Sequence, residues 1–209
     1  NRYQAALSCA FTIAVKEWGW MDFNIMGKVK KSKEPRGRVR FLSDDERKAL
    51  LKSCEDSDSR NLYVIVVLAL STGMRQGEIL GLTWDTVNLK KGQITLHDTK
   101  NSETRSVPVT GVALQLLKNH AKVRRLDTTL VFPARKDDKP ADIRSAWLCA
   151  IERAGIEDFR FHDLRHTAAS YLAMSGATLA EIAEILGHKT LAMVKRYSRL
   201  SPDHVSAVR

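Results

Sequence analysis

Cysteine is scarce in this chain of 209 residues, and the number and spacing of its cysteines argue against a disulfide-linked protein and against a zinc-binding module. There are three, an odd number, and they lie far apart at Cys9, Cys54 and Cys149. A disulfide framework needs paired cysteines, and a structural zinc site needs ligands at close spacing. The sequence therefore predicts no disulfide scaffold and no metal cluster, but three buried thiols in a reducing cytosol.

The chain also lacks a long apolar run. Its longest apolar block, residues 62–70, is about half of the roughly 20 residues that a membrane-spanning helix requires. No signal peptide precedes the first helical pattern, which is already under way at Asn1. We therefore expect a cytoplasmic protein without a membrane contact, and we expect the chain to be part of a longer protein.

Acidic residues are fewer than basic ones. The chain has 24 Asp and Glu against 34 Lys and Arg, which gives a net charge of +10 and a pI near 9.7. This excess predicts a polyanionic partner, and nucleic acid comes first because backbone phosphates attract Lys and Arg whatever the base sequence. The alternative is a basic soluble protein without such a partner.

Three parts follow one another along the sequence. Residues 1–27 open with a helical pattern of apolar residues that Gly19 ends, and such a helix must pack on something. Residues 28–40 contain seven basic residues and one acid, with Pro35 and Gly37, which is typical of a linker. Either this linker is a solvated loop, or it crosses DNA phosphates through Lys28, Lys30, Lys31, Lys33, Arg36 and Arg38.

Residues 41–209 form the third part, which we predict to be mainly α with a small antiparallel β-sheet (α+β). Ser43 and Glu46 make a capping box that begins a helix. Residues 60–71 fit a buried strand or a buried helix equally well. Residues 93–97 and 104–109 alternate as the strands of a hairpin with Lys100 near its tip, and helices are expected over 111–124 and 143–154.

The stretch 161–197 places polar residues at the ends of helices. A helix is expected from Asp163, and Gly176 follows it. Thr178 and Glu181 then form a second capping box, whose helix Gly187 closes, and a short third helical run ends near Tyr197. Helix ends leave backbone N–H groups and side chains available to a ligand, so this placement indicates a site.

Taken together, the segments TGMRQGEILGLTW, TKNSETRSVPV, HDLRHTAASYLA, LGHKT and KRYS resemble the tyrosine recombinase (phage integrase) family. The resemblance covers roughly residues 39–201. It implies the DNA breaking-rejoining fold and a catalytic site made of seven residues: Arg75, Glu78, Lys100, His162, Arg165, His188 and Tyr197. Residues 1–27 would then be the last helix of a core-binding domain.

The resemblance also implies a role for each residue. Tyr197 would attack a DNA phosphodiester and form a 3′-phosphotyrosyl link. Arg75 and Arg165 would hold the non-bridging oxygens, His162 and His188 would assist by hydrogen bonding and proton transfer, Lys100 would protonate the departing 5′-oxygen, and Glu78 would order the site. Such chemistry needs no metal and no ATP, because the phosphotyrosine conserves the bond energy.

The chemistry itself asks for these residue types. A phosphodiester gains negative charge in its transition state, and two permanently protonated guanidiniums oppose that charge with bidentate donors. A free phenol has a pKa of about 10, so a nearby base and cations must assist its ionisation. Lysine suits the role of the acid because its pKa can be tuned.

Each residue also has an ordinary structural reading. Arg75 and Glu78 could form a surface ion pair, and Lys100 could be a solvated charge. His162 and His166 could bind a metal on one helix face, but Arg165 would put a positive charge beside it. His166 is more simply a structural hydrogen-bonding residue. Tyr197 could be a half-buried aromatic, and Tyr171 is expected in the core.

The resemblance implies a bacterial mobile element and a homotetramer on double-stranded DNA, with this piece monomeric when free. Two alternatives stay open. A type IB topoisomerase uses similar residues to relax DNA without exchanging partners, and a non-catalytic DNA-binding module could keep the fold.

Overall fold

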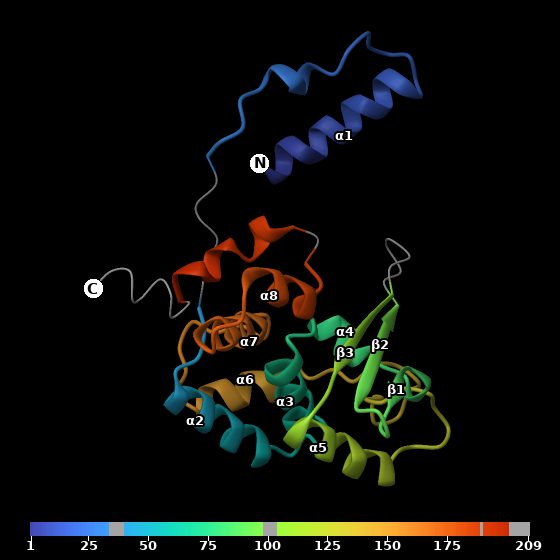
Figure 1. The fold of residues 1–209 in the computed structure, drawn as a ribbon. Helices are drawn as coiled ribbons and strands as arrows, with labels where there is room; N and C mark the ends of the chain where they lie inside the picture. Colours follow the sequence, from blue (N-terminus) through green and yellow to red (C-terminus); the bar gives the residue numbers. More distant parts are fainter. Residues whose placement is uncertain (34–39, 98–103, 189, 201–209) are drawn as a thin grey trace, which may run out of the picture. The chain divides into compact units, whose positions relative to one another are not determined.

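The structure is a computed structural model, and it describes residues 1–33, 40–97, 104–188 and 190–200. The chain divides into two compact units, Asn1–Arg38 and Val39–Arg209 (Figure 1). No helix in these ranges is both long and apolar enough to cross a membrane.

The first unit is one helix with a return segment. Helix α1 (Arg2–Lys16) packs on the short 3-10 helix η1 (Ile25–Lys28). Asn24 joins the two, since its amide donates to the Ser8 carbonyl at 2.8 Å and to the Thr12 hydroxyl at 2.9 Å. The aromatic side chains of Tyr3 and Trp20 are exposed. The unit has a small interior of its own and leaves much of its apolar surface uncovered.

Helix α3 (Leu62–Thr72) lies at the centre of the second unit. It packs against α2 (Asp44–Glu55), α5 (Gly111–Lys122) and α7 (Asp163–Met174). The sequence left helix and strand open here, and the segment is a helix. Its residues are buried on nearly every side, so packing outweighs the modest preference of Val and Ile for strands.

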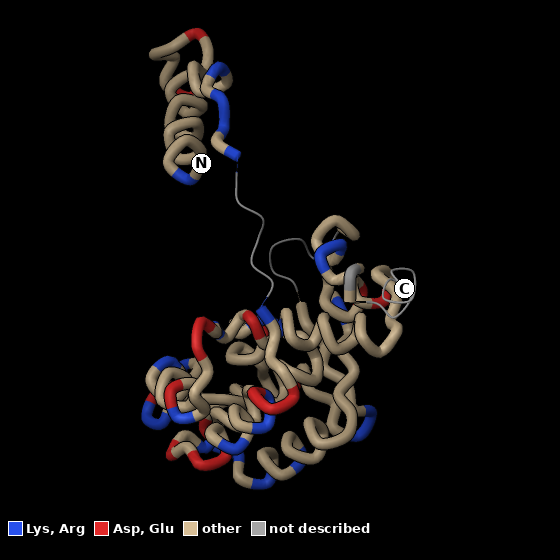
Figure 2. The backbone as a smooth tube through the Cα atoms, turned by 90° about the vertical axis from the view of Figure 1, so that its left-hand side faces the viewer, with Lys and Arg blue, Asp and Glu red and all other residues tan. Residues whose placement is uncertain are grey.

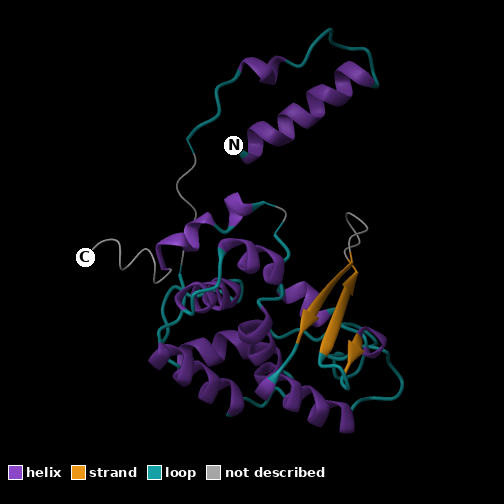
Figure 3. Cartoon of the chain, in the orientation of Figure 1, coloured by secondary structure: helices purple, strands orange, loops and turns teal. Residues whose placement is uncertain are grey.

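The sheet lies beside the helices (Figure 3) and has three antiparallel strands in the order β1 (Val87–Asn88), β2 (Gln93–His97) and β3 (Thr104–Pro108). Ile94 pairs with Val107, and both are buried. The predicted mainly helical domain with a small antiparallel sheet is confirmed. Along the chain, α4 (Gln76–Leu80) and the 3-10 helix η2 (Trp84–Thr86) connect α3 to the first strand of the sheet.

Helix α6 (Arg144–Arg153) packs on α2, and the chain then enters α7 and α8 (Leu179–Leu186). Two 3-10 helices follow, η3 (Leu191–Met193) and η4 (Lys195–Leu200). A second apolar cluster joins these elements, and Leu186, Val194 and Tyr197 are among its buried members. Both predicted capping boxes are present, at Ser43 with Glu46 and at Thr178 with Glu181.

Two expectations about burial were wrong in part. Only Cys54 is a buried thiol, and burial raises its pKa to about 12, whereas Cys9 on α1 and Cys149 on α6 are exposed. Tyr171 is only partly buried, because its hydroxyl reaches the edge of the core and donates to the Asp44 carboxylate at 2.8 Å.

Candidate active site

Arg75 and Glu78 form the first wall of the site, at the beginning of α4. Gly73, with φ +64°, ends α3, and Arg75 then precedes the first helical residue. Glu78 accepts from the Arg75 backbone N–H at 2.8 Å and from Arg75 Nη1 at 2.6 Å. The predicted pair therefore exists, and it is built into the start of a helix, so its geometry is fixed by the backbone as well as by charge.

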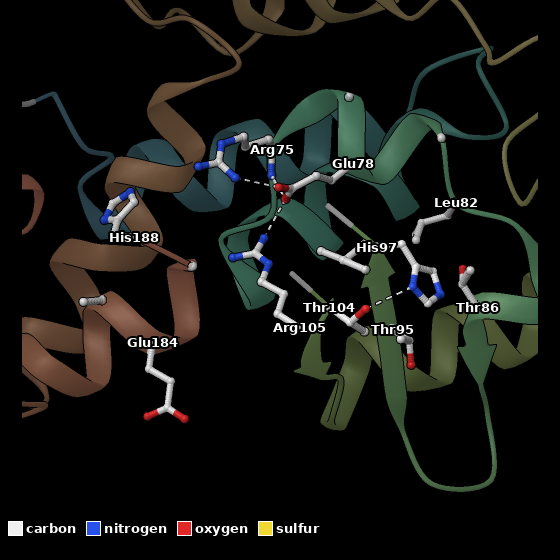
Figure 4. A pocket seen from close by; sticks show the side chains of 15 residues that line it. Arg75, Glu78, Leu82, Thr86, Thr95, His97, Thr104, Arg105, Glu184 and His188 are labelled. Atoms are coloured by element: carbon white, nitrogen blue, oxygen red, sulfur yellow. Dashed lines mark hydrogen bonds and ion pairs between the residues drawn. The ribbon is translucent and has the colours of Figure 1, made fainter. Parts of the chain in front are cut away.

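Arg105 is a residue that the sequence reasoning missed. It lies on β3 and donates from Nη2 to Glu78 Oε2 at 2.7 Å (Figure 4). The two guanidiniums of Arg75 and Arg105 thus approach one carboxylate from opposite sides. An Arg on the second strand of the hairpin was visible in the sequence, but no local pattern could say that its side chain reaches Glu78 on α4.

Arg165 connects two distant segments from inside the protein. Its side chain on α7 is only 4% exposed. Nη1 donates to the Gly73 carbonyl and Nη2 to the Leu186 carbonyl, each at 2.6 Å. Burial, and then the charge of Arg75, lower the pKa of Arg165 to about 10, so the group stays protonated at neutral pH. Arg165 therefore holds the turn before Arg75 against the end of α8.

His188 follows directly after that end of α8. Gly187 closes the helix with φ +63°, and the His188 N–H donates to the Ala183 carbonyl at 2.8 Å. Burial, followed by the charges of Arg165, Arg75 and Arg105, lowers the pKa of His188 to about 4. The ring is therefore neutral near pH 7.

His162 and His166 lie one turn apart at the start of α7, with ring centroids 5.4 Å apart, and the Tyr197 ring lies beside His166. Partial burial, together with the nearby Arg165, lowers the pKa of His162. The Tyr197 ring is 1% exposed, and its hydroxyl is hydrogen-bonded to Nδ1 of His166. Burial raises the pKa of Tyr197, while Arg196 and Arg165 oppose that rise. Sequence reasoning gave His166 a hydrogen-bonding role, and its partner is the predicted nucleophile.

A cleft of about 690 Å³ opens between α4, the sheet and α8 (Figure 4). Four residues of the site line it: Arg75, Glu78, Arg105 and His188. Arg165, His162 and Tyr197 are not among the lining residues. The structure thus brings Arg75 and Glu78, from early in the sequence, and His188, from late in it, to one cleft. It keeps Tyr197 buried in the second apolar cluster, outside the lining of that cleft.

The remaining predicted residues are placed as follows. Lys100, Arg36 and Arg38 lie outside the described residues. The predicted DNA-binding lysines 28, 30, 31 and 33 are all exposed in the first unit, where the basic run stands out in blue at the end of the return segment (Figure 2). Lys28 Nζ lies 4.8 Å from the centroid of the Phe23 ring. Across the described ranges, no group of three or more His, Cys, Asp or Glu is arranged to hold a metal.

The second unit has the fold of an integrase catalytic domain. The catalytic domain of bacteriophage HP1 integrase superposes with a TM-score of 0.64 at 29% identity, covering 82% of this chain and 94% of that one. A lambda integrase dimer bound to a COC′ core site shares the fold at 20% identity, with a TM-score of 0.70 over 91% of this chain and 71% of that chain.

Comparison of the sequence with known proteins leads to the same family as the comparison of the fold. The profile of the Phage integrase family matches residues 40–204, and this chain belongs to that family, the tyrosine recombinases. The shufflon-specific DNA recombinase of Escherichia coli is 38% identical over 200 residues, which cover 94% of this chain and 49% of that protein. The integrase of Salmonella phage P22 is 34% identical over 207 residues, covering 92% and 51%. The chain spans about half the length of these curated relatives.

Proposed function

We propose that this chain is the catalytic part of a site-specific DNA recombinase that cleaves and rejoins DNA through a 3′-phosphotyrosyl intermediate. One observation carries the proposal. Arg165 hydrogen-bonds the Gly73 carbonyl, two residues before Arg75, and the Leu186 carbonyl, two residues before His188, and so holds Arg75 and His188 at one cleft. That cleft suits a phosphodiester.

The charges around the cleft suit the transition state. Arg75 and Arg165 would bind the two non-bridging oxygens, on which negative charge grows as the new bond forms. Arg165 uses two of its five N–H donors on carbonyls, so others remain for an anion. The neutral His188 and His162 would add hydrogen bonds, and Glu78 would hold the Arg75 guanidinium in place.

In the proposed step, the Tyr197 oxygen attacks phosphorus and passes its proton to the His166 ring, to which it is hydrogen-bonded. The bond between phosphorus and the 5′-oxygen breaks, and the 5′-oxygen takes a proton from Lys100. One phosphodiester is exchanged for another, so no ATP is consumed, and the free 5′-hydroxyl of a second strand can reverse the step. His166 is the base nearest to the phenol in the resting protein.

DNA is the proposed partner because the first unit carries exposed lysines and because a structural neighbour is bound to DNA. The exposed lysines of the first unit would contact phosphates, and the lambda integrase relative is seen as a dimer on a core site. We infer that the whole protein assembles as a homotetramer on two duplexes, that this piece is monomeric when free, and that the protein works in the cytoplasm, on the DNA of a mobile element.

The experiment that tests the proposal traps the covalent intermediate. The chain is incubated without Mg²⁺ with a pool of nicked duplexes of randomised core sequence, in which the short cleaved strand diffuses away and prevents religation. We expect a protease-sensitive protein–DNA adduct that wild type forms and Tyr197→Phe does not. An adduct that persists in Tyr197→Phe would reject the nucleophile, and no adduct with wild type would reject the activity.

The two alternatives predict other outcomes. A type IB topoisomerase relaxes supercoiled plasmid without giving recombinant products, and a non-catalytic module retains all measurable activity in Tyr197→Phe. The curated relatives described above carry the names recombinase and integrase, which favours strand exchange.

A further inference from the structure

Arg105 occupies an unusual place on the sheet. Along β3 its neighbour on the same face is Val107, which is buried in the core against Ile94. Arg105 pairs with Leu96 one step further toward the cleft, and its side chain is 22% exposed. A charged residue on the core side of a strand needs a partner, and Glu78 on α4 supplies it at 2.7 Å.

This contact determines where Glu78 can point. Oε2 of Glu78 binds Arg105 and the Arg75 backbone N–H, which leaves Oε1 for the Arg75 guanidinium at 2.6 Å. Arg75 itself is 45% exposed, and a long exposed side chain loses entropy when it is held in one conformation. Because Arg105 holds the Glu78 carboxylate in place, that carboxylate restricts the conformations of the Arg75 guanidinium.

The guanidinium of Arg105 also lies against the backbone of Gly187. A Cβ atom added at Gly187 would be 2.1 Å from Arg105 Nη1 and 2.8 Å from Arg105 Cζ, closer than any real contact. Gly187 has φ +63°, so glycine serves both the helix end and this approach. Arg105 therefore packs on the residue that immediately precedes His188.

We propose that Arg105 is a positioning residue of the cleavage site, which holds Glu78 against Arg75 and supports the Gly187 turn that carries His188. One side chain on the sheet thus sets the relation between a phosphate-binding arginine from α4 and a histidine from the end of α8. The inference rests on the proposed function, since positioning matters only if a phosphodiester reacts here.

The kinetic test uses a nicked duplex that wild type has selected from the randomised pool. With protein in excess, Arg105→Gln should form the adduct about 10-fold to 100-fold more slowly, because misplaced groups lose transition-state contacts, while the dissociation constant for the duplex stays the same. Arg105→Lys, which keeps the charge but not the planar fork, should recover part of the rate. Arg153→Gln is the matched control, because Arg153 joins α6 to the Ser53 carbonyl away from the cleft.

A double-mutant cycle shows whether Arg105 acts through Glu78. If it does, the loss of rate in the Arg105→Gln, Glu78→Gln double variant should be smaller than the product of the two single losses, and what Arg105→Gln still costs beyond Glu78→Gln reports its support of the Gly187 turn. Multiplicative losses would overturn the inference. So would weaker DNA binding with a smaller salt dependence and an unchanged rate at saturation, which would make Arg105 a phosphate contact. Equal slowing by Arg153→Gln would also overturn it.

A second readout needs no activity. The charges facing His188 come from Arg75 on the α4 turn, Arg105 on β3, Arg165 on α7 and Arg196 on η4. In the DNA-free protein, NMR titration of His188 should show a higher pKa in Arg105→Gln and a value near wild type in Arg105→Lys. If wild type forms no adduct, the proposed function fails, and an unchanged His188 titration in Arg105→Gln would separately overturn the placement of Arg105.

Discussion

The hydroxyl of Tyr197 on η4 and Nδ1 of His166 on α7 form a hydrogen bond inside the second apolar cluster. Burial lowers the pKa of His166 to about 4, so its ring is neutral, and burial raises the pKa of Tyr197, so the phenol keeps its proton. In the tautomer with a bare Nδ1, the ring accepts a hydrogen bond from that phenol. The nucleophile of the proposed reaction is therefore held protonated, and outside the cleft lining, in this state.

Replacing His166 by Ala should lower the free energy of unfolding by about 1–3 kcal/mol, because it leaves a buried phenol without its partner. Tyr197→Phe removes the same bond from the other side, so in the double variant the two losses should not add. Urea denaturation of both single variants and the double variant measures the coupling. Strictly additive losses would contradict a hydrogen bond between them.

Arg75 and Arg165, the two arginines proposed to bind the phosphate oxygens, should respond differently to substitution by Lys. Both changes should slow adduct formation about 10²-fold to 10³-fold with little effect on DNA affinity, because a bidentate donor is lost from the transition state. Arg75→Lys should change stability by less than about 0.5 kcal/mol, since its ion pair is exposed.

Arg165→Lys should in addition cost about 1–3 kcal/mol, because a single ammonium cannot replace both carbonyl bonds of the buried guanidinium. Chemical denaturation beside single-turnover cleavage separates the two effects. Equal stability losses in the two variants would contradict the bridging role of Arg165.

Stability should fall as the pH drops from about 6.5 toward 4. His166 and His188 have pKa values of about 4 in the folded protein against 6.5 in an unfolded chain. In that window the unfolded state binds more protons, so unfolding becomes easier as the pH falls, and above it the effect vanishes. Glu46 adds to this fall only below about pH 5, because its pKa is about 2 in the folded protein, where Arg40 holds the carboxylate, against 4.5 in an unfolded chain. Urea midpoints at pH 7.5 and pH 5 should differ less in His188→Asn than in wild type.

Lys100 is proposed as the acid, and a change of leaving group tests this. Lys100→Ala should slow cleavage on the order of 10²-fold to 10⁴-fold on an ordinary duplex. On a duplex with sulfur in place of the bridging 5′-oxygen it should be near wild type, because a thiolate leaves without a proton. Tyr197→Phe serves as the control and should fail on both substrates. Equal slowing of Lys100→Ala on both would remove Lys100 from the role of acid.

The basic run of the first unit should contribute to DNA affinity through charge. Lys30→Ala should weaken binding to any duplex and reduce the slope of log K against log salt by about 1. Lys139→Ala is the matched control, because Lys139 is exposed but lies 3.5 Å from the Asp137 carboxylate. Fluorescence anisotropy at several salt concentrations measures both, and identical slopes in wild type and Lys30→Ala would count against a phosphate contact.

The sequence by itself determined the features that depend on neighbouring residues. The capping boxes at Ser43 and Thr178, the helix end at Gly187 and the two strands of the hairpin were all predictable, because caps, turns and strand alternation are local. The family was likewise visible in short motifs, and its profile match agrees.

Only the tertiary structure decided which residues are buried and which side chains from different elements contact one another. It made residues 62–72 a helix, because burial on nearly every side outweighs the preference of β-branched residues for strands, and it left Cys9 and Cys149 on the surface. It also gave His166 its partner Tyr197, and gave Glu78 a second arginine from β3. These contacts join residues that are far apart in the chain, and no local pattern specifies which distant side chain will fill the space beside another.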